Sequence, residues 1–291
     1  DHWLGRSRGG QEVQVAFYGG SFTCLPGDRQ EALLAAVQPA LRTGRVASIR
    51  LSTRPDCLDP GLCRWLVGQG VKVVELGVQS LSDPVLDAAG RGHSAEQSCA
   101  AVALLRAAGL EVGLQLMPGL PGESCRSFLQ TITQVIALRP DFVRLYPVLV
   151  LAGSGLELLY RQGGYRPQSL GRAVALVARC YERLTAAGIR VVRMGLQPTP
   201  SLTEALIAGP FHPAFGELVL ARLWLRRLRA RLCRLRPQEN LTVHVSHRDR
   251  SALAGMGGGN IRRLAELGYA GRLQIMTDKT MVRGSIRYAV D

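Results

Sequence analysis

The sequence predicts an α/β protein whose larger part is a partial, open parallel β/α barrel and whose smaller part is a basic α+β domain. Short β-branched or apolar runs alternate with longer helical patterns from residue 13 to about residue 196, which is typical of repeated βα units. Six such runs are too few for a complete eight-stranded barrel. The pattern changes near Pro198, so we expect two domains, residues 1–205 and residues 206–291.

The expected strands of the first domain span residues 13–18, 48–53, 71–78, 111–117, 142–150 and 190–194. Helical patterns lie between them at residues 29–42, 60–68, 95–108, 123–138 and 170–187. Gly109 and Gly188 directly follow two of these helices. Glycine at that position commonly ends a helix, because it adopts the left-handed conformation without strain.

The second domain opens with one long expected helix, residues 214–236, in which a leucine stripe runs between two flanks of arginines. The order after it is strand, helix, glycine loop, helix, strand, at residues 241–247, 250–254, 255–259, 261–267 and 272–277. A final strand over residues 281–288 is expected to pair with the strand at 272–277.

The composition favours a polyanionic partner. The formal net charge is +14, and all basic residues except Lys72 and Lys279 are arginine. Clustered arginines bind phosphate groups and gain free energy by releasing counterions. No apolar run is long enough to span a bilayer, and no signal peptide is apparent, so we expect a cytoplasmic protein with no membrane partner.

The cysteines indicate neither a disulfide framework nor a structural zinc site. They are seven, scattered and without a CxxC pair: Cys24, Cys57, Cys63, Cys99, Cys125, Cys180 and Cys233. We therefore expect reduced, mostly buried thiols, as is usual inside cells.

Polar residues or bare glycines follow four of the expected strands. These segments are Gly19-Gly20-Ser21, residues 52–56, residues 75–80 and residues 115–123. Because the carboxyl ends of parallel barrel strands meet at one rim, we expect them to form a ligand site.

The order of these motifs resembles the radical S-adenosylmethionine (SAM) superfamily, with Arg91-Gly92-His93-Ser94 and residues 141–164 in matching places. More narrowly, it is similar to the branch that holds the catalytic subunit of the elongator complex and its bacterial homologues, and more distantly to oxygen-independent coproporphyrinogen oxidase. The resemblance covers residues 13–213. It implies a radical-SAM barrel without its first strand. The acetyltransferase domain of the elongator subunit has no counterpart in this sequence, so we expect no acetyl transfer.

The resemblance also implies a set of cofactor-binding residues, while catalytic residues stay unknown. By analogy, Gly19, Gly20 and Ser21 hold the amino group of SAM, Gln79 and Arg91 reach its ribose and carboxylate, and Gln115, Met117 and Tyr146 lie on the adenine side. Glu123 is expected to be structural, since a carboxylate is favoured in the first turn of a helix. Glu75 and Arg144 either pair with each other or bind substrate.

The family further implies a [4Fe–4S] cluster held by three cysteines, and an electron donor for it. Those cysteines would precede Val13, and residues 1–12 contain none. We therefore expect no metal ligand in this chain, cluster ligands upstream of residue 1, and no activity of this chain alone.

The loop Gly255-Met256-Gly257-Gly258 resembles the GXXG loop of KH modules, which clamps nucleotides between two helices. This resemblance implies RNA binding by Gly255, Gly258, Arg262 and Arg263, with electrostatic support from Arg226 and Arg229 of the long helix. The alternative is a solvated basic face.

Three functions therefore stay open. The leading one is a radical SAM enzyme that acts on tRNA or another RNA. The second is an inactive nucleic-acid-binding homologue that keeps the barrel as a scaffold. The third is a small-molecule radical enzyme related to the porphyrinogen oxidases.

Overall fold

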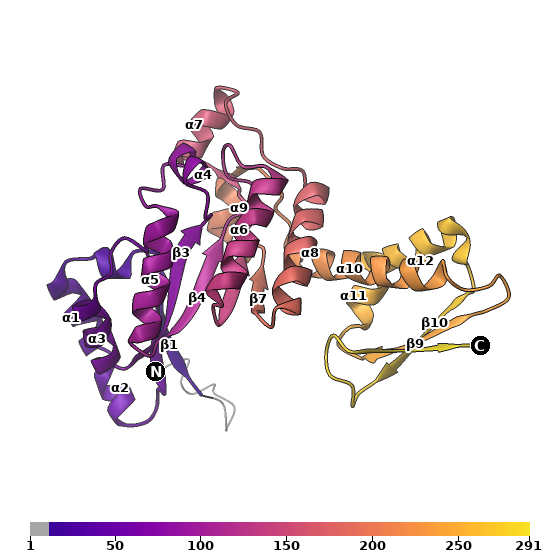
Figure 1. Cartoon of the computed structure of the whole chain (residues 1–291), viewed down its shortest axis with the longest axis horizontal. Helices are drawn as coiled ribbons and strands as arrows, with labels where there is room; N and C mark the ends of the chain where they lie inside the picture. The colour runs from indigo at the N-terminus through magenta and orange to yellow at the C-terminus, as the bar shows by residue number, and fades with distance from the viewer. Residues whose placement is uncertain (1–11) are drawn as a thin grey trace.

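A curled sheet of six parallel strands forms the main body of the molecule (Figure 1). The computed structural model describes residues 12–291, so the cysteine-free segment before Val13 lies outside the described part except for Glu12. The strands, in spatial order, are β1 (Gln14–Phe17), β2 (Ser48–Thr53), β3 (Val71–Gln79), β4 (Glu111–Leu116), β5 (Phe142–Leu145) and β7 (Arg190–Met194). The predicted partial parallel barrel is confirmed.

Helices cover the convex face of this sheet and bury its apolar side. They are α1 (Gly27–Ala35), α2 (Gln38–Arg42), α3 (Pro60–Gly68), α4 (Asp83–Ala88), α5 (Ala95–Ala107), α6 (Cys125–Leu138) and α8 (Leu170–Ala186), with a 3₁₀ turn η2 (Phe22–Cys24) after β1. Alternate strand residues such as Leu51, Val74, Leu114 and Val143 enter this core. The intervening residues face the concave side of the half-barrel.

Two predicted elements are interrupted by proline. The expected helix over residues 29–42 divides into α1 and α2, because Pro39 cannot continue the hydrogen bonds of α1. The expected strand over residues 142–150 is divided as well. Pro147 lacks an N–H, so β5 ends before it, and residues 150–151 form β6 (Val150–Leu151), which pairs with β8 (Leu206–Ala208). Helices α7 (Gly155–Arg161) and α9 (Pro200–Ala205) flank this small ribbon.

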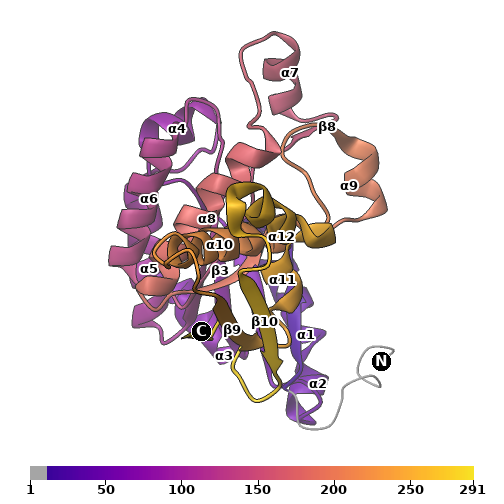
Figure 2. The same cartoon turned by 90° about the vertical axis from the view of Figure 1, so that its right-hand side faces the viewer.

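The second domain packs three helices on one face of a three-stranded sheet (Figure 2). Its elements are α10 (Phe215–Leu232), β9 (Leu241–Ser246), α11 (Arg250–Ala254), η3 (Met256–Gly258), α12 (Gly259–Leu264), η4 (Ala265–Tyr269), β10 (Leu273–Asp278) and β11 (Ile286–Val290). The expected pairing of the last strand with its predecessor is wrong. β9 is the buried centre of the sheet, and β11 pairs with its free edge opposite β10.

Helix α10 takes part in both hydrophobic cores. Phe215 and Val219, in its first turns, pack in the barrel core, whereas Leu228 and Leu232 pack in the core of the second domain. Leu220 touches both. The domain division after residue 205 stays a prediction. Within residues 12–291, no helix is both long and apolar enough to cross a membrane.

Candidate functional site

A buried ion pair lies on the concave face of the half-barrel. Arg144 Nε on β5 lies 2.6 Å from Glu75 Oε2 on β3. The Ser52 hydroxyl on β2 donates a hydrogen bond to Glu75 Oε1 at 3.3 Å. The sequence left open whether these two charges pair or bind substrate, and the structure shows the pair.

Two tyrosines at the mouth of the half-barrel meet on the same guanidinium. Arg144 donates hydrogen bonds to the Tyr146 hydroxyl at 3.2 Å and to the Tyr18 hydroxyl at 3.3 Å. Burial lowers the pKa of Arg144, but the hydrogen bond to Tyr18 and the charge of Glu75 outweigh it, so its pKa is raised. Tyr18 was not among the residues predicted for the site, although its position directly before Gly19 was an available signal.

Phe142 fills the concave face below this ion pair. A Cβ atom on Gly113 of β4 would lie 2.2 Å from Phe142 Cζ, so only glycine leaves room for the ring. The Arg50 guanidinium lies over the same ring, 5.4 Å from its centroid.

The end of β3 is bent so that Gln79 can reach its neighbours. Gln79 has a φ of 67°, in the left-handed region, and is buried. Its side-chain oxygen accepts a hydrogen bond from Gln115 Nε2 at 3.2 Å, and its carbonyl accepts one from the Met117 N–H at 2.8 Å. A side chain on Gly77 would collide with the Gln79 amide at 2.8 Å. A strained non-glycine residue is a frequent feature of ligand sites.

Arg91 lies half-buried against this bend, without an acidic partner among the described residues. Its Nη2 lies 3.0 Å from Met117 Sδ, and its Nε is buried with no hydrogen-bond partner among the described residues. Burial, and secondarily the charge of Arg54, lower the pKa of Arg91. An unsatisfied buried donor of this kind is costly unless a ligand supplies the acceptor.

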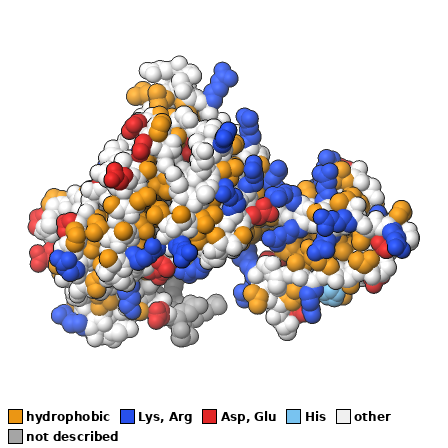
Figure 3. Space-filling view, in the orientation of Figure 1, with side chains coloured by type: hydrophobic (Ala, Val, Ile, Leu, Met, Phe, Trp, Pro, Cys, Tyr) orange, Lys and Arg blue, Asp and Glu red, His pale blue; other side chains and the backbone are white. Residues whose placement is uncertain are grey.

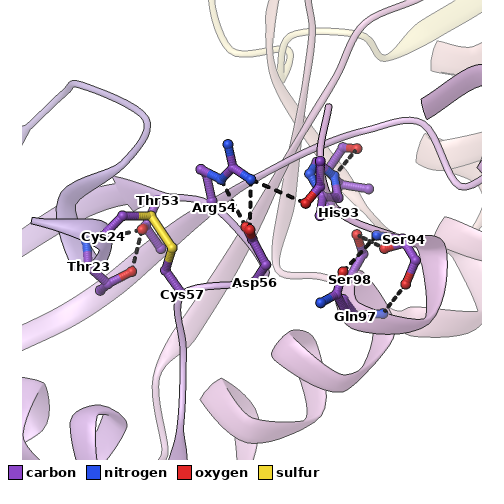
Figure 4. Close-up of polar contacts among 12 residues, drawn as sticks. Thr23, Cys24, Thr53, Arg54, Asp56, Cys57, His93, Ser94, Gln97 and Ser98 are labelled. Carbon is purple, nitrogen blue, oxygen red and sulfur yellow. Dashed lines mark hydrogen bonds and ion pairs between the residues drawn. A yellow bond between two sulfur atoms is a disulfide. The ribbon is translucent and has the colours of Figure 1, made fainter. Parts of the chain in front are cut away.

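The neighbouring loops are fixed by hydrogen bonds (Figure 4). Arg54 donates to both oxygens of Asp56, at 2.9 and 2.7 Å, which is the main reason that the pKa of Asp56 is lowered. The same guanidinium donates to the Gly92 carbonyl at 3.3 Å. His93 Nε2 contacts the Val78 carbonyl at 3.2 Å, while its Nδ1 is buried without a hydrogen-bond partner in the described part of the chain. Two buried nitrogens without hydrogen-bond partners among the described residues, Arg91 Nε and His93 Nδ1, therefore lie in the same loop.

Gly19, Gly20 and Ser21 lie at the end of β1 and leave backbone exposed. Gly20 has a φ of +74°, and a Cβ on either glycine would meet nothing within 4 Å. No hydrogen bond joins these three residues directly to Gln79 or Arg91 in the described chain. Tyr18, next to Gly19, instead accepts a hydrogen bond from Arg144 of β5.

Cys24 and Cys57 form a disulfide, so the expectation of reduced thiols is wrong for this pair. Their Cα atoms are 5.3 Å apart, because the loops after the paired strands β1 and β2 lie side by side at the rim (Figure 4). A sequence separation of 33 residues conceals this proximity. The expectation of mostly buried cysteines is also wrong: Cys99, Cys125 and Cys233 are exposed, and only Cys63 and Cys180 are buried free thiols.

A cavity of about 490 Å³ adjoins the rim on the side of Arg91 and Met117. Apolar residues, among them Leu120 and Val148, make up most of its remaining lining. Among the described residues, the rim thus offers a guanidinium without an acidic partner, a pair of amides and an apolar surface, which together suit a ligand with a carboxylate, hydroxyls and a flat ring.

Comparisons with known proteins agree with this architecture. The model of the "Radical SAM superfamily" matches residues 4–135, and that of the "Radical_SAM C-terminal domain" matches residues 140–224. The chain belongs to the radical SAM superfamily. Neither match extends past residue 224, so most of the second domain lies beyond them.

Relatives of this radical SAM chain include tRNA-modifying enzymes. The tRNA uridine(34) acetyltransferase of Methanocaldococcus infernus is 29% identical over 195 residues, which cover 66% of this chain and 36% of that protein. Elongator complex protein 3 of Homo sapiens is 30% identical over 235 residues, which cover 73% and 42%. The chain therefore spans about two fifths of the length of these relatives.

Two solved structures share the fold. Elp3 of Methanocaldococcus infernus with an N-terminal deletion has a TM-score of 0.66 at 24% identity, covering 75% of this chain and 55% of that one. Coproporphyrinogen III oxidase (HemN) of Escherichia coli has a TM-score of 0.50 at 20% identity, covering 73% and 46%. Both support the partial barrel of the radical SAM chain.

Glu123 stabilises the loop that follows β4 in this radical SAM domain. Its carboxylate accepts hydrogen bonds from the Gly119 N–H at 2.7 Å and from the Ser80 hydroxyl at 3.3 Å. Burial nevertheless raises the pKa of Glu123 to about 7. Tyr165 packs beside it and donates to the Gly119 carbonyl at 2.6 Å.

The raised pKa makes Glu123 a source of pH-dependent stability. The folded protein holds this proton up to about pH 7, whereas the unfolded chain releases it near the ordinary glutamate pKa of 4.5. The stability that Glu123 contributes is therefore complete at low pH and is lost as the pH rises through this window. We expect Glu123→Gln to gain stability relative to the parent protein by up to about 3 kcal/mol between pH 5 and pH 8.

Urea denaturation of both proteins at pH 5, 6, 7 and 8 checks this prediction. Glu157, a half-buried carboxylate whose pKa is lowered mainly by the Gly153 N–H, provides the control. Glu157→Gln should show no gain over the same range. A constant difference between Glu123→Gln and the parent at all four pH values would contradict the prediction.

The second domain engages most of the residues predicted to bind RNA in contacts within the chain. Arg226 pairs with Glu182 of α8 at 2.9 Å, and Arg263 pairs with Glu266 at 2.8 Å. Arg262 donates to the Gly257 carbonyl inside the glycine loop at 2.5 Å. Gly255 and Gly258 lie in this loop with positive φ, and Arg229 is exposed without a partner among the described residues.

Proposed function

We propose that this chain is the cofactor-binding part of a radical SAM enzyme that modifies tRNA. The observation that carries the proposal is Arg91, a half-buried side chain whose Nε is buried without a partner and which has no carboxylate within ion-pair distance among the described residues. A guanidinium binds a carboxylate through two parallel hydrogen bonds, so the amino-acid end of SAM supplies the missing acceptor.

The other rim residues receive roles that fit their contacts. The exposed carbonyls near Gly19, Gly20 and Ser21 would accept the amino group of SAM. The joined amides of Gln79 and Gln115 would bind its ribose hydroxyls. Met117 and Tyr146 would lie along adenine, Met117 by its position in the apolar cavity beside Arg91. When SAM is reductively cleaved, it supplies a 5′-deoxyadenosyl radical that removes hydrogen from the substrate.

The cluster that such chemistry needs does not fit the described residues. Within residues 12–291, no three His, Cys, Asp or Glu side chains are grouped so that they could hold a metal ion. The chain's own residues can thus bind and orient the cofactor, and we assign no electron-transfer step or electron donor to them.

The RNA partner is proposed from the relatives and from the charge. The relatives at 29 and 30% identity are named for tRNA uridine(34) acetylation and for the elongator complex. The net charge of +14 supports a polyanionic substrate. A cytoplasmic location, where tRNA is found, is part of the same proposal.

Arg91→Gln is expected to weaken SAM binding about 10- to 100-fold, because one charge-assisted carboxylate contact contributes roughly 1.5–3 kcal/mol. Isothermal titration of the chain with SAM measures the effect, and thermal unfolding checks that the variant is folded. Arg64→Gln, on the exposed face of α3, is the matched control and should bind as the parent does. Equal affinity of Arg91→Gln and the parent would reject the assigned site.

A further inference from the structure

A basic groove separates the C-terminal half of α10 from the edge strand β11. Its volume is about 370 Å³, and it is lined by Arg227, Ala230, Arg231, Arg234, Ile286 and Tyr288. Three of these six residues are arginines, and none is acidic. We refer to this feature as the α10–β11 groove.

Two arginines of the groove lie on one side of the helix, and the third lies directly after it. Arg227 and Arg231 are one turn apart on α10, about 6 Å along the helix axis. Arg234 lies in the turn that follows Leu232, the last residue of the helix, and its N–H donates to the Arg231 carbonyl. The row suits an extended chain of anionic groups better than a single small anion.

Aromatic rings support two of these guanidinium groups. Arg231 lies over the ring of Tyr288, 4.6 Å from its centroid, and Arg227 lies over Trp224 at 5.4 Å. Stacking holds the guanidinium plane while leaving its N–H groups and its outer face available. Bases of single-stranded RNA stack on such guanidinium planes as well as on aromatic rings.

The charges of the groove are unneutralised within the described chain. Arg227, Arg231 and Arg234 form no ion pair among residues 12–291. By contrast, Arg226 on the neighbouring flank of α10 pairs with Glu182. Like charges held side by side repel one another, and a bound polyanion would remove that repulsion.

The groove continues toward the barrel. A second cavity, of about 550 Å³, shares Arg227 with it and extends to Val191 and Arg193 of β7. Arg193 is the register partner of Arg144, which faces the rim. The two acidic residues of this cavity, Glu217 and Asp249, both lie within ion-pair distance of Arg283, at 3.4 and 3.6 Å. Basic side chains also gather over the junction of α8 and α10 (Figure 3).

We propose that the α10–β11 groove binds single-stranded RNA. Arg227 and Arg234 would contact successive phosphates, and the outer face of Arg231 would stack on a base. The choice of RNA as the occupant rests on the proposed function. The groove, rather than the predicted flank of Arg226 or the glycine loop, is then the main RNA contact of the second domain.

Fluorescence anisotropy with a labelled single-stranded 12-nucleotide RNA tests the proposal. The triple variant Arg227→Gln/Arg231→Gln/Arg234→Gln should weaken binding at least tenfold. Since each lost phosphate contact in a single strand lowers the salt slope by about 0.7, loss of the two contacts of Arg227 and Arg234 should lower it by about 1.4. Tyr288→Leu should weaken binding about threefold or more, by removing the support of Arg231, while Tyr288→Phe should not.

A control triple, Arg126→Gln/Arg172→Gln/Arg179→Gln, removes the same charge from exposed positions on α6 and α8. It should change affinity less than threefold. Equal losses in the two triples would show that binding follows net charge alone and would overturn the proposal. Displacement of the RNA by polyglutamate at equal charge concentration would also overturn it, in favour of an acidic peptide.

The result can be separated from the SAM site. Arg91→Gln should leave RNA affinity unchanged, and the groove triple should leave SAM affinity unchanged. RNA binding through the groove without any SAM binding would disprove the proposed function and keep this inference. SAM binding at Arg91, with RNA affinity unaffected by the groove triple, would support the proposed function and reject the RNA-binding groove.

Discussion

Replacing Gly113 by alanine is expected to destabilise the barrel by about 2–3 kcal/mol, the upper part of the range for overpacking a core. The added Cβ would lie 2.2 Å from the ring of Phe142, which is itself buried and covered by Arg50. The ring cannot move without displacing its neighbours, because protein interiors are close-packed. Urea denaturation measures the change in the free energy of unfolding.

Two further variants test the cause. The double variant Gly113→Ala/Phe142→Leu should recover much of the loss, since the smaller side chain makes room for the new methyl group. Gly171→Ala, on α8 with open space around its Cβ position, should be neutral or stabilise by up to about 1 kcal/mol. If Gly113→Ala behaved as Gly171→Ala does, the packing argument would be refuted.

Removing one member of the Glu75–Arg144 pair is expected to cost about 3 kcal/mol, the lower end of the range for buried pairs, because Arg144 is partly open to solvent. The two single variants should differ in how much free energy of unfolding they lose. In Arg144→Met the Glu75 carboxylate keeps only the Ser52 hydroxyl, whereas in Glu75→Gln the guanidinium keeps the hydroxyls of Tyr18 and Tyr146. Arg144→Met should therefore be the more destabilising change.

A double-mutant cycle with Glu75→Gln/Arg144→Met measures the coupling. The double variant should be more stable than the sum of the single losses predicts, with a coupling energy of about 1–3 kcal/mol. The exposed pair Arg190–Glu111, at 2.8 Å, is the control, and its cycle should give less than about 1 kcal/mol. Equal coupling in the two cycles would show that burial has no role.

The parts of the fold that the sequence predicted are those set by local patterns. The strand over residues 48–53, the helix over residues 60–68 and the strand over residues 190–194 were expected with the bounds that the structure has. In each element, the spacing of apolar residues sets the type of structure, and a proline or glycine within a few residues marks where it starts or ends. The errors at residues 29–42 and 142–150 have the same local origin, since each ignored an internal proline.

Contacts between distant segments were not predictable in the same way. Pairing of β11 with β9, and of Cys24 with Cys57, depends on which elements the topology places side by side. Arg226 was expected to face RNA because its flank of the helix is basic, but its position next to α8 brings it to Glu182. A pattern along one element cannot reveal the charge of its neighbour.

In the candidate site, too, features set by local sequence were predictable and contacts between distant segments were not. The rim motifs could be found because glycines and polar residues stand out after apolar strands. The left-handed conformation of Gln79 and the isolation of the Arg91 Nε were invisible, since both depend on the packing of β3, β4 and the loop after α4. The joining of Tyr18 to Tyr146 through Arg144 likewise needs the curvature of the sheet to bring β1 near β5.

Helix α10 makes the second domain a lever arm on the barrel. Its first residue, Phe215, lies against Gly195 at the end of β7, where a Cβ would be 2.6 Å from the Phe215 Cβ. Its last turn is anchored by Leu228 and Leu232 in the other core. A continuous helix has no hinge between these two anchors. A displacement of the second domain would therefore move α10 as a rigid body and would be transmitted to the end of the edge strand β7.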